Sequence, residues 1–387
     1  MNGVALNCRF SGTLQPTGTQ TAAFALFDAI VRMPERECRL TIFADPRFAG
    51  IAEWSEAQNV TLVEVPFSRW SRGRAQLWEQ MLLPGLCRKA GCTVAHHPIT
   101  TSPFLTRGVK NVVTLHDLNF LTHPEWYSRA FRAVYSFTAI PGLMRAARVV
   151  AISDYVREQA GRRLGIEANR IRRIYNGVRF SPDGESFAHS DVPYLLSVGA
   201  LQPHKNLKRL ILAFRQLREW HPELELWIAG RMQPGFSAMP GLAELLETPG
   251  LQMLGYLSDE ELRASYANAL AFCYPSLEEG FGLPILEAMA CGTLVVAANV
   301  SCLPEISGGH AEMVDPLSPE SIASGVETIL RLTPGEREER ISRARSWAEG
   351  FNWQHAAWAY LAIYQELDQG ILQYAHHEQD AIQEERL

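Results

Sequence analysis

The chain has 387 residues, a formal net charge of −6, and hydrophobic and charged fractions of 47% and 20%, as expected of a soluble globular protein long enough for two domains. No stretch approaches about 18 uninterrupted apolar residues and the start, MNGVALNCRF, lacks a charged and apolar leader, so we expect neither a transmembrane helix nor a signal peptide. Seven scattered cysteines without a CxxC pair favour a reducing compartment over a disulfide framework.

Charge is unevenly distributed along the chain. Residues 1–180 carry 23 Lys/Arg against 13 Asp/Glu, whereas residues 181–387 carry 13 against 29. A basic first half suggests that it faces something anionic, such as a nucleic acid, a phospholipid surface or a phosphorylated acceptor. The alternative is charge drift without a function.

In chain order, the first half alternates short apolar, β-branched runs with helical segments, the pattern of buried parallel strands. The runs are Val4–Cys8, Leu40–Ala44, Val60–Val65, Thr93–Ala95, Val112–Leu115 and Val149–Ile152. This alternation predicts a doubly wound α/β domain over residues 1–182.

A second series of such runs predicts a second α/β domain over residues 190–350. Its runs are Tyr194–Val198, Leu224–Ala229, Gln252–Leu254, Ala271–Tyr274, Leu294–Ala297 and Glu312–Val314. The Pro/Gly/Ser-rich stretch near residues 180–190 is the predicted boundary. Residues 351–373 predict a helix rich in aromatic residues, and the polar tail after Gln373 predicts a mobile end.

The most informative segment is YPSLEEGFGLPILEAMACG, residues 274–292. An apolar strand enters an acidic, Gly-rich turn, Pro284 suits the first turn of a helix and Gly292 suits the position after its end. Such a turn directs N–H groups and a positive dipole end at a phosphate. Glu279 and Glu287 would accept hydrogen bonds from hydroxyl groups. The combined chemistry favours a nucleotide sugar, although one more structural αβ crossover remains the alternative.

Two further residues follow predicted strands, where open α/β domains bind ligands. Lys205, at a helix entry, would suit a diphosphate, or it is a solvated lysine. His116 would bond a sugar hydroxyl or act in acid/base chemistry, or it is structural.

The loop from Arg9 to Gln20 contains glycines and would form one wall of a cleft suited to an acceptor. It is not a GxGxxG fingerprint, which argues against a nicotinamide or flavin enzyme. Basic and aromatic residues interleave from Arg69 to Leu82; this segment either lies at a membrane interface or is a basic loop before a core helix. The chain lacks an Asp-x-Asp pair, a P-loop, a GxSxG elbow and a zinc pattern.

With these residues assembled, the chain resembles a retaining GT-B glycosyltransferase of family GT4. The motif EEGFGLPILE carries the resemblance, supported by VGALQPHKNLKRLILAF, LHDLNFLTHPEW, VVAISDYVREQ, YNGV, LPEISGG and FNW. The resemblance implies two Rossmann-like domains facing an interdomain cleft, with the C-terminal helix crossing back to the first domain. The combination of LHDL and HPEW makes the chain similar to bacterial mannosyl- and rhamnosyltransferases of surface-polysaccharide assembly.

The resemblance also implies roles for matching residues. Glu287 would bind the nucleotide ribose, Glu279 would hold the donor sugar, Lys205 would neutralise the leaving diphosphate and His116 would contact the donor sugar near the reacting centre. Backbone groups of the phosphate turn and residues lining the donor site complete the set: Gly18, His204, Tyr256, Leu257, Gly280, Phe281, Gly282 and Leu283. Ala200 and His204 stand where many relatives carry an arginine, so Lys205 acts with less help or a protonated His204 assists.

The resulting hypothesis is metal-independent transfer of a hexose, mannose from GDP-mannose, with retention and without a cofactor. The acceptor would be a polyprenyl-diphosphate-linked oligosaccharide, in exopolysaccharide, O-antigen or capsule assembly, met in the cytoplasm at the inner face of the plasma membrane. Alternatives are a UDP- or dTDP-sugar donor carrying rhamnose, glucose or GlcNAc, and a non-catalytic two-domain sugar-binding protein. Nucleic acid is the weakest alternative, because the basic residues form no recognisable module.

Overall fold

The computed structural model describes residues 2–12, 16–34, 36–48, 50–106, 108–180, 192–231 and 239–370. The chain forms two compact units. Within the described residues, unit 1 comprises residues 2–118, 130–177 and 352–370; unit 2 comprises residues 119–129 and 178–351. The predicted boundary at 182–190 and the predicted mobile tail beyond Gln373 lie outside the described residues.

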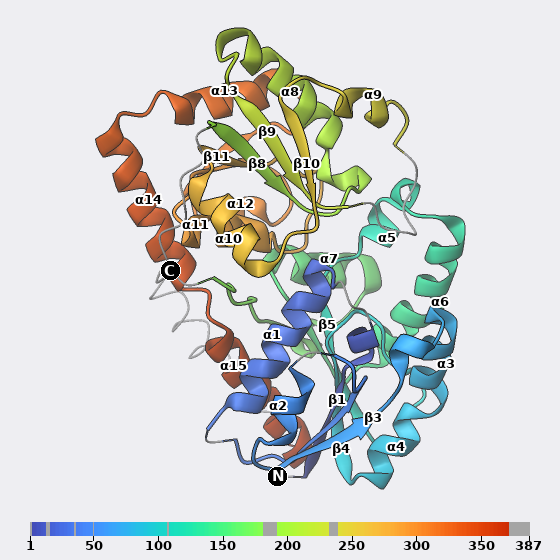
Figure 1. Cartoon of the computed structure of the whole chain (residues 1–387). Coiled ribbons are helices and arrows are strands. Elements are labelled where there is room, and N and C mark those ends of the chain that lie inside the picture. The colour runs from blue at the N-terminus through green and yellow to red at the C-terminus, as the bar shows by residue number, and fades with distance from the viewer. Residues whose placement is uncertain are drawn as a thin grey trace. The chain divides into compact units, whose positions relative to one another are not determined.

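Unit 1 is built on a parallel sheet of seven strands in the order β3-β2-β1-β4-β5-β6-β7 (Figure 1). The strands are β1 Gly3–Asn7, β2 Leu40–Ala44, β3 Val60–Glu64, β4 Cys92–His97, β5 Lys110–Leu115, β6 Arg148–Ala151 and β7 Ile171–Arg173. All six predicted strands are confirmed. The seventh escaped prediction because it is three residues long and carries two arginines, so its sequence shows no apolar run.

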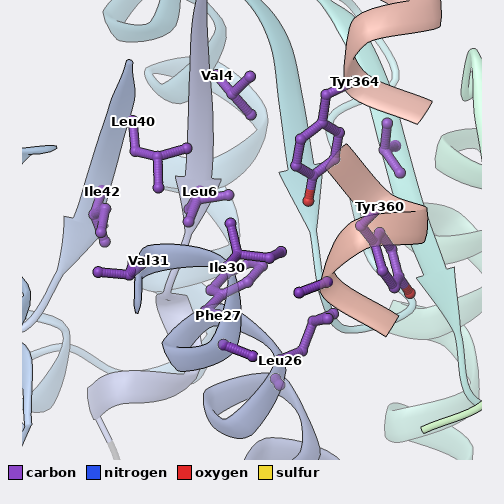
Figure 2. Close-up of a cluster of buried hydrophobic side chains, with 14 of the residues drawn as sticks. Val4, Leu6, Leu26, Phe27, Ile30, Val31, Leu40, Ile42, Tyr360 and Tyr364 are labelled. Atoms are coloured by element: carbon purple, nitrogen blue, oxygen red, sulfur yellow. The ribbon is translucent and has the colours of Figure 1, made fainter. Parts of the chain in front are cut away.

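Helices cover both faces of this sheet. On one face α1 (Gly18–Arg32) and α15 (Trp353–Gln369) pack on Val4, Leu6 and Ile42, as Figure 2 shows. On the other face α3 (Arg72–Met81) and α4 (Leu83–Lys89) pack on Ala5, Phe43 and Ala95. The other α-helices in the described part of unit 1 are α2 Ile51–Ser55, α6 Arg129–Arg145 and α7 Asp154–Leu164.

Helix α15 is part of the unit 1 core. Tyr360 and Tyr364 are buried, and their hydroxyl groups lie 2.8 Å from Thr114 Oγ1 and 2.5 Å from His96 Nδ1. The aromatic residues of the predicted C-terminal helix therefore pack against strands β4 and β5. Helix α1 begins at Gly18, within the predicted Arg9–Gln20 loop, because Thr17 and Gln20 form a capping box.

Unit 2 is a parallel sheet of six strands in the order β10-β9-β8-β11-β12-β13. Its strands are β8 Tyr194–Val198, β9 Glu225–Ala229, β10 Leu251–Gly255, β11 Ala271–Tyr274, β12 Val295–Ala298 and β13 Ala311–Val314, which confirms the six predicted runs. Its helices are α5 Asn119–Thr122, α8 Leu207–Trp220, α9 Leu242–Leu246, α10 Asp259–Asn268, α11 Leu283–Ala290, α12 Leu303–Ser307, α13 Pro319–Leu330 and α14 Pro334–Glu349.

Each sheet has one point at which the strand order reverses. The chain builds outward from β1 in both directions in unit 1, and from β8 in unit 2, so the reversals lie between β1 and β4 and between β8 and β11. Ligands of doubly wound domains bind beside the carboxyl ends of the strands at such a point. Those ends carry Asn7 and His97 in unit 1, and Val198 and Tyr274 in unit 2.

Candidate active site

An ion pair lies beside the β8/β11 reversal of unit 2. Lys205 Nζ is 2.6 Å from Glu279 Oε1 and 2.6 Å from the Tyr274 hydroxyl, and it lies 4.7 Å from the centre of the Tyr274 ring. Lys205 follows β8 and Glu279 follows β11, so the parallel strands bring together residues that are 74 positions apart. An ammonium has three N–H donors, so one remains for a further acceptor.

The Glu279 carboxyl of this pair is ionised at neutral pH. Burial is the largest effect on Glu279 and raises the pKa of its carboxyl, but the Lys205 charge and hydrogen bonds outweigh burial and hold that pKa below its usual value. His204 is also buried, and burial together with the Lys205 charge lowers its pKa to about 4. The imidazole is therefore neutral at pH 7 in this structure, which favours the alternative in which Lys205 acts without a charged His204.

The turn after Glu279 leads into α11 as the sequence predicts. Gly282 adopts φ 93°, and a Cβ there would lie 2.9 Å from Leu303 Cδ2, so this position favours glycine. Pro284 occupies the first turn, and Gly292, with φ 83°, follows the helix end. The first N–H groups of a helix have no partner within it, so the start of α11 at Leu283 directs the positive end of the helix dipole toward this turn.

Glu287 is held by a residue that the sequence did not indicate. Arg179 Nε and Nη2 both lie 3.0 Å from Glu287 Oε1, and the Tyr266 hydroxyl donates to Oε2 at 3.2 Å. Arg179 Nη1 also donates to Asp259 Oδ1 at 2.6 Å. Burial disfavours the guanidinium charge, but the two carboxylates outweigh it and raise the pKa of Arg179. Glu287 is therefore a buried, fully ion-paired acid.

The HPEW segment also belongs to unit 2, although the sequence places it in the first half. His123 Nε2 lies 3.4 Å from Glu278 Oε2, and its ring stacks on Trp126 at 3.9 Å. Trp126 in turn lies 5.7 Å from the His204 ring. The segment thus supports the loops that carry Lys205 and Glu279. Sequence reasoning missed this contact because His123 is 82 positions from Lys205 and 155 positions from Glu278.

Lys205 borders a small recess at the carboxyl ends of β8 and β9. It is lined by Ser197, Val198, Gly199, Lys205, Leu207, Ile228, Tyr274 and Ser276. Gly199 allows the lysine stem to approach, since a Cβ there would lie 3.1 Å from Lys205 Cε. The lysine stem and its neighbours therefore fill the recess, and it holds no space for a water-sized group.

Other predicted site residues lie elsewhere. Tyr256 and Leu257 follow the edge strand β10, and the Tyr256 ring is 47% exposed and lies 5.2 Å from the Arg231 guanidinium. Gly18 is the first residue of α1 in unit 1, and open space lies where its Cβ would be. No group of three His, Cys, Asp or Glu side chains that could hold a metal occurs among the described residues.

His116 lies in unit 1, after β5, and is buried. Its Nε2 donates to the Pro98 carbonyl at 2.7 Å, and burial lowers its pKa to about 4. The ring is therefore a neutral, oriented imidazole rather than a proton donor at pH 7.

Comparison with known proteins places the chain in a class. The family described as "Glycosyl transferases group 1" matches residues 183–347, and "Glycosyltransferase Family 4" matches residues 22–181. The O-antigen chain mannosyltransferase B of Escherichia coli is 30% identical over 63% of this chain and 67% of its own length. The O-antigen chain mannosyltransferase RfbU of Salmonella typhimurium is 27% identical over 73% and 80%.

Among solved structures, the sucrose-phosphate synthase of Thermosynechococcus elongatus superposes with a TM-score of 0.72 at 19% identity, covering 96% of this chain and all of that one. The fold and the strand-end site define a glycosyltransferase with two Rossmann-like domains of the GT-B type. The chain belongs to glycosyltransferase family 4, group 1.

Proposed function

We propose that this enzyme transfers mannose from GDP-mannose to a lipid-linked oligosaccharide, with retention of the anomeric configuration. The observation that carries the proposal is the Lys205–Glu279 pair beside the first turn of α11. One spare ammonium donor and the helix N-terminus suit a diphosphate, while the flanking carboxylate suits the hydroxyl groups of a sugar. Similarity to O-antigen mannosyltransferases favours mannose as the transferred hexose.

In this mechanism negative charge builds up on the diphosphate as the glycosyl bond breaks. Lys205 and the N–H groups of the turn lie on fixed elements, so they stabilise that charge without reorganisation. Glu279 accepts a hydrogen bond from a hydroxyl group of the donor sugar and holds the Lys205 ammonium in place. Neutral His116 would contact the sugar through its ring. We assign no general base, no metal and no cofactor, in keeping with front-face displacement.

A lipid-linked acceptor requires an approach to the membrane, and unit 1 offers a surface for it. The apolar–basic surface consists of exposed Leu77, Met81, Leu82, Leu105 and Phe137 with Arg72, Arg74 and Arg132. Helices α3 and α6 lie side by side here (Figure 1), since Gln80 donates to the Ser102 carbonyl and Gly142 contacts Ser102. Exposed apolar groups with arginines suit an anionic lipid surface.

No helix within the described part of the chain is both long and apolar enough to cross a membrane. All seven cysteines are free thiols. A reducing compartment suits such thiols, and we propose that the enzyme works in the cytoplasm at the inner face of the plasma membrane.

The test is a donor panel with purified protein. Calorimetry with GDP-mannose, UDP-glucose and dTDP-rhamnose should give tightest binding for GDP-mannose, and tighter binding of another donor would overturn the mannose assignment. Lys205→Ala should lower transfer at least about tenfold, because a charge-assisted hydrogen bond contributes about 1.5–3 kcal/mol. Lys208→Ala is the matched control and should retain activity, because Lys208 lies three residues further on, in α8, and donates to the Pro240 carbonyl. Equal turnover of the two variants would remove Lys205 from the site.

A further inference from the structure

A second polar cluster lies in unit 1, at the carboxyl end of β1 and beside the β1/β4 reversal. Its centre is Glu79 of α3, which is completely buried. Oε1 accepts from Asn7 Nδ2 at 2.6 Å and from Arg9 Nε at 3.3 Å; Oε2 accepts from Gln76 Nε2 and Thr101 Oγ1, both at 3.1 Å. These four bonds use the four lone-pair sites of the carboxylate. Glu79 therefore orients its neighbours and has no capacity for a ligand.

Arg9 is the member of the cluster that can meet a ligand. Its Nε bonds Glu79, its Nη2 donates to Thr101 Oγ1 at 2.7 Å, and its side chain is 15% exposed. Within the described residues, no hydrogen bond or ion pair uses Nη1. The guanidinium is thus fixed through Nε and Nη2, and three of its five N–H donors, two on Nη1 and one on Nη2, remain for a ligand.

The strand ends behind Arg9 fix this arrangement. Asn7 Nδ2 also lies 3.1 Å from His97 Nδ1, and His97 Nε2 lies 3.3 Å from Asn111 Oδ1. Burial lowers the pKa of His97 to about 4, so the ring is neutral and adds no charge. Asn7 and His97 end the two strands that flank the reversal. A rigid set of buried polar groups at that place is typical of a binding site.

The charges at the centre of the cluster balance, because the Arg9 guanidinium is paired with the buried Glu79 carboxylate. Phosphate sites gather an excess of positive charge, whereas the hydroxyl groups of a neutral sugar need donors and acceptors without net charge.

We propose that Arg9, held by Glu79 and Thr101 at the β1/β4 reversal, binds hydroxyl groups of the acceptor glycan. Arg9 is then an acceptor-specificity residue and Glu79 is its positioning residue. The inference rests on the proposed sugar transfer, since it assigns the acceptor side of that reaction. It locates recognition of the neutral sugar on unit 1, apart from the diphosphate of a lipid-linked acceptor.

The first experiment measures binding alone, by saturation-transfer NMR of mannobiose with the full chain. The double variant Arg9→Gln/Glu79→Gln keeps the buried cluster charge-balanced, and it should lose saturation transfer by at least about fivefold, the worth of one or two hydrogen bonds. Arg162→Gln, an exposed arginine of α7 paired with Glu158, is the control and should bind as the wild type does. Thermal melting shows that each variant is folded.

Undiminished saturation transfer in the folded double variant would overturn the assignment, and so would a wild type that does not bind mannobiose. Arg9-dependent binding of pyrophosphate in place of mannobiose would also overturn it, in favour of an anionic ligand.

The second experiment separates this subsite from the proposed function. With GDP-mannose, the double variant should lose transfer to mannobiose while it retains hydrolysis of the donor, which depends on unit 2. A wild type that neither transfers nor hydrolyses would refute the proposed function and leave the binding result standing. Equal transfer by wild type and double variant would refute the subsite alone.

Discussion

Arg179 occupies the carboxylate that we assign to the nucleotide ribose. Its Nε donates to Glu287 Oε1, its Nη2 lies at ion-pair distance from the same oxygen, and the Tyr266 hydroxyl donates to Oε2. A ribose diol that donates two hydrogen bonds would have to share this carboxylate with both side chains. The ribose and Arg179 therefore compete for Glu287.

Because Arg179 and the ribose compete for Glu287, we expect Arg179→Ala to bind GDP more tightly than the wild type. The gain should be about 2–10-fold, which corresponds to one additional hydrogen bond from a ribose hydroxyl to Glu287. Calorimetry with 2′,3′-dideoxy-GDP should show no gain, because that ligand lacks the diol. The matched control is Arg340→Ala, which removes an arginine of α14 that pairs with Glu312 of β13. Weaker binding of GDP by Arg179→Ala would instead make Arg179 a support for Glu287.

The predictability of these residues follows from their distance along the chain. Lys205 and Glu279 each follow a recognisable strand. Because the carboxyl ends of parallel strands share one edge of the sheet, the sequence indicates that these two side chains lie close together. Arg179 lies 108 positions from Glu287, in a segment without periodicity, and no local pattern indicates where its side chain points. The Arg9–Glu79 contact spans 70 positions and escaped for the same reason.

At the scale of elements, the turn before α11 depends on one glycine. Gly282→Ala introduces a Cβ at φ 93° and 2.9 Å from Leu303 Cδ2, so we expect a loss of about 1–3 kcal/mol in the free energy of unfolding, with weaker donor binding. Urea denaturation measures the first effect and calorimetry the second.

Gly335 provides the control for that substitution. It lies in the first turn of α14, with open space where a Cβ would be, so Gly335→Ala should be neutral or stabilising by up to about 1 kcal/mol. Comparable destabilisation by both substitutions would show that backbone strain at Gly282 is not the cause.

Helix α3 shows how two sequence interpretations can each describe part of one element. From the sequence, residues 69–82 either lie at a membrane interface or form a basic loop before a helix of the core. Trp78 is buried beside Phe43 and Phe67, whereas Leu77 and Met81 are 63% and 69% exposed. The sequence shows the aromatic and basic interleaving, but only packing decides which face of the helix meets the core.

At the scale of the whole molecule, three buried histidines predict acid sensitivity. Burial lowers the pKa of His97, His116 and His204 to about 4, below the value of about 6.5 in an unfolded chain. Between about pH 6.5 and about pH 4 the unfolded state binds more protons than the folded state. The contribution of the neutral histidines to the free energy of unfolding is therefore complete above about pH 6.5 and is lost as the pH falls toward about 4. Each histidine contributes up to roughly 3 kcal/mol.

Thermal melting from about pH 7 to about pH 4.5 tests this expectation, with a transition temperature that falls as pH falls. His116→Gln should flatten the slope, since a glutamine cannot take up the proton. His355 is exposed on α15, and His355→Gln should leave the slope unchanged. A slope that is the same in all three proteins would contradict the assignment.

The apolar–basic surface predicts reversible binding to anionic vesicles. In flotation assays with phosphatidylglycerol vesicles, the double variant Leu77→Ser/Phe137→Ser should float less than the wild type, because two exposed apolar groups are lost. Trp220→Ser removes an apolar group of unit 2 that is 64% exposed and should float normally. Equal flotation of both variants would exclude this surface as the docking site, and raised salt should weaken wild-type binding.

Helix α15 has a consequence for the order in which the chain can fold. Tyr360 and Tyr364 complete the core around β4 and β5, yet they leave the ribosome after all of unit 2 has been made. Until then His96 and Thr114 have no phenol beside them, and the apolar face that α15 covers is open to solvent. The first unit made is therefore the last to be finished, and a chain stopped before residue 353 would keep an exposed core that invites aggregation.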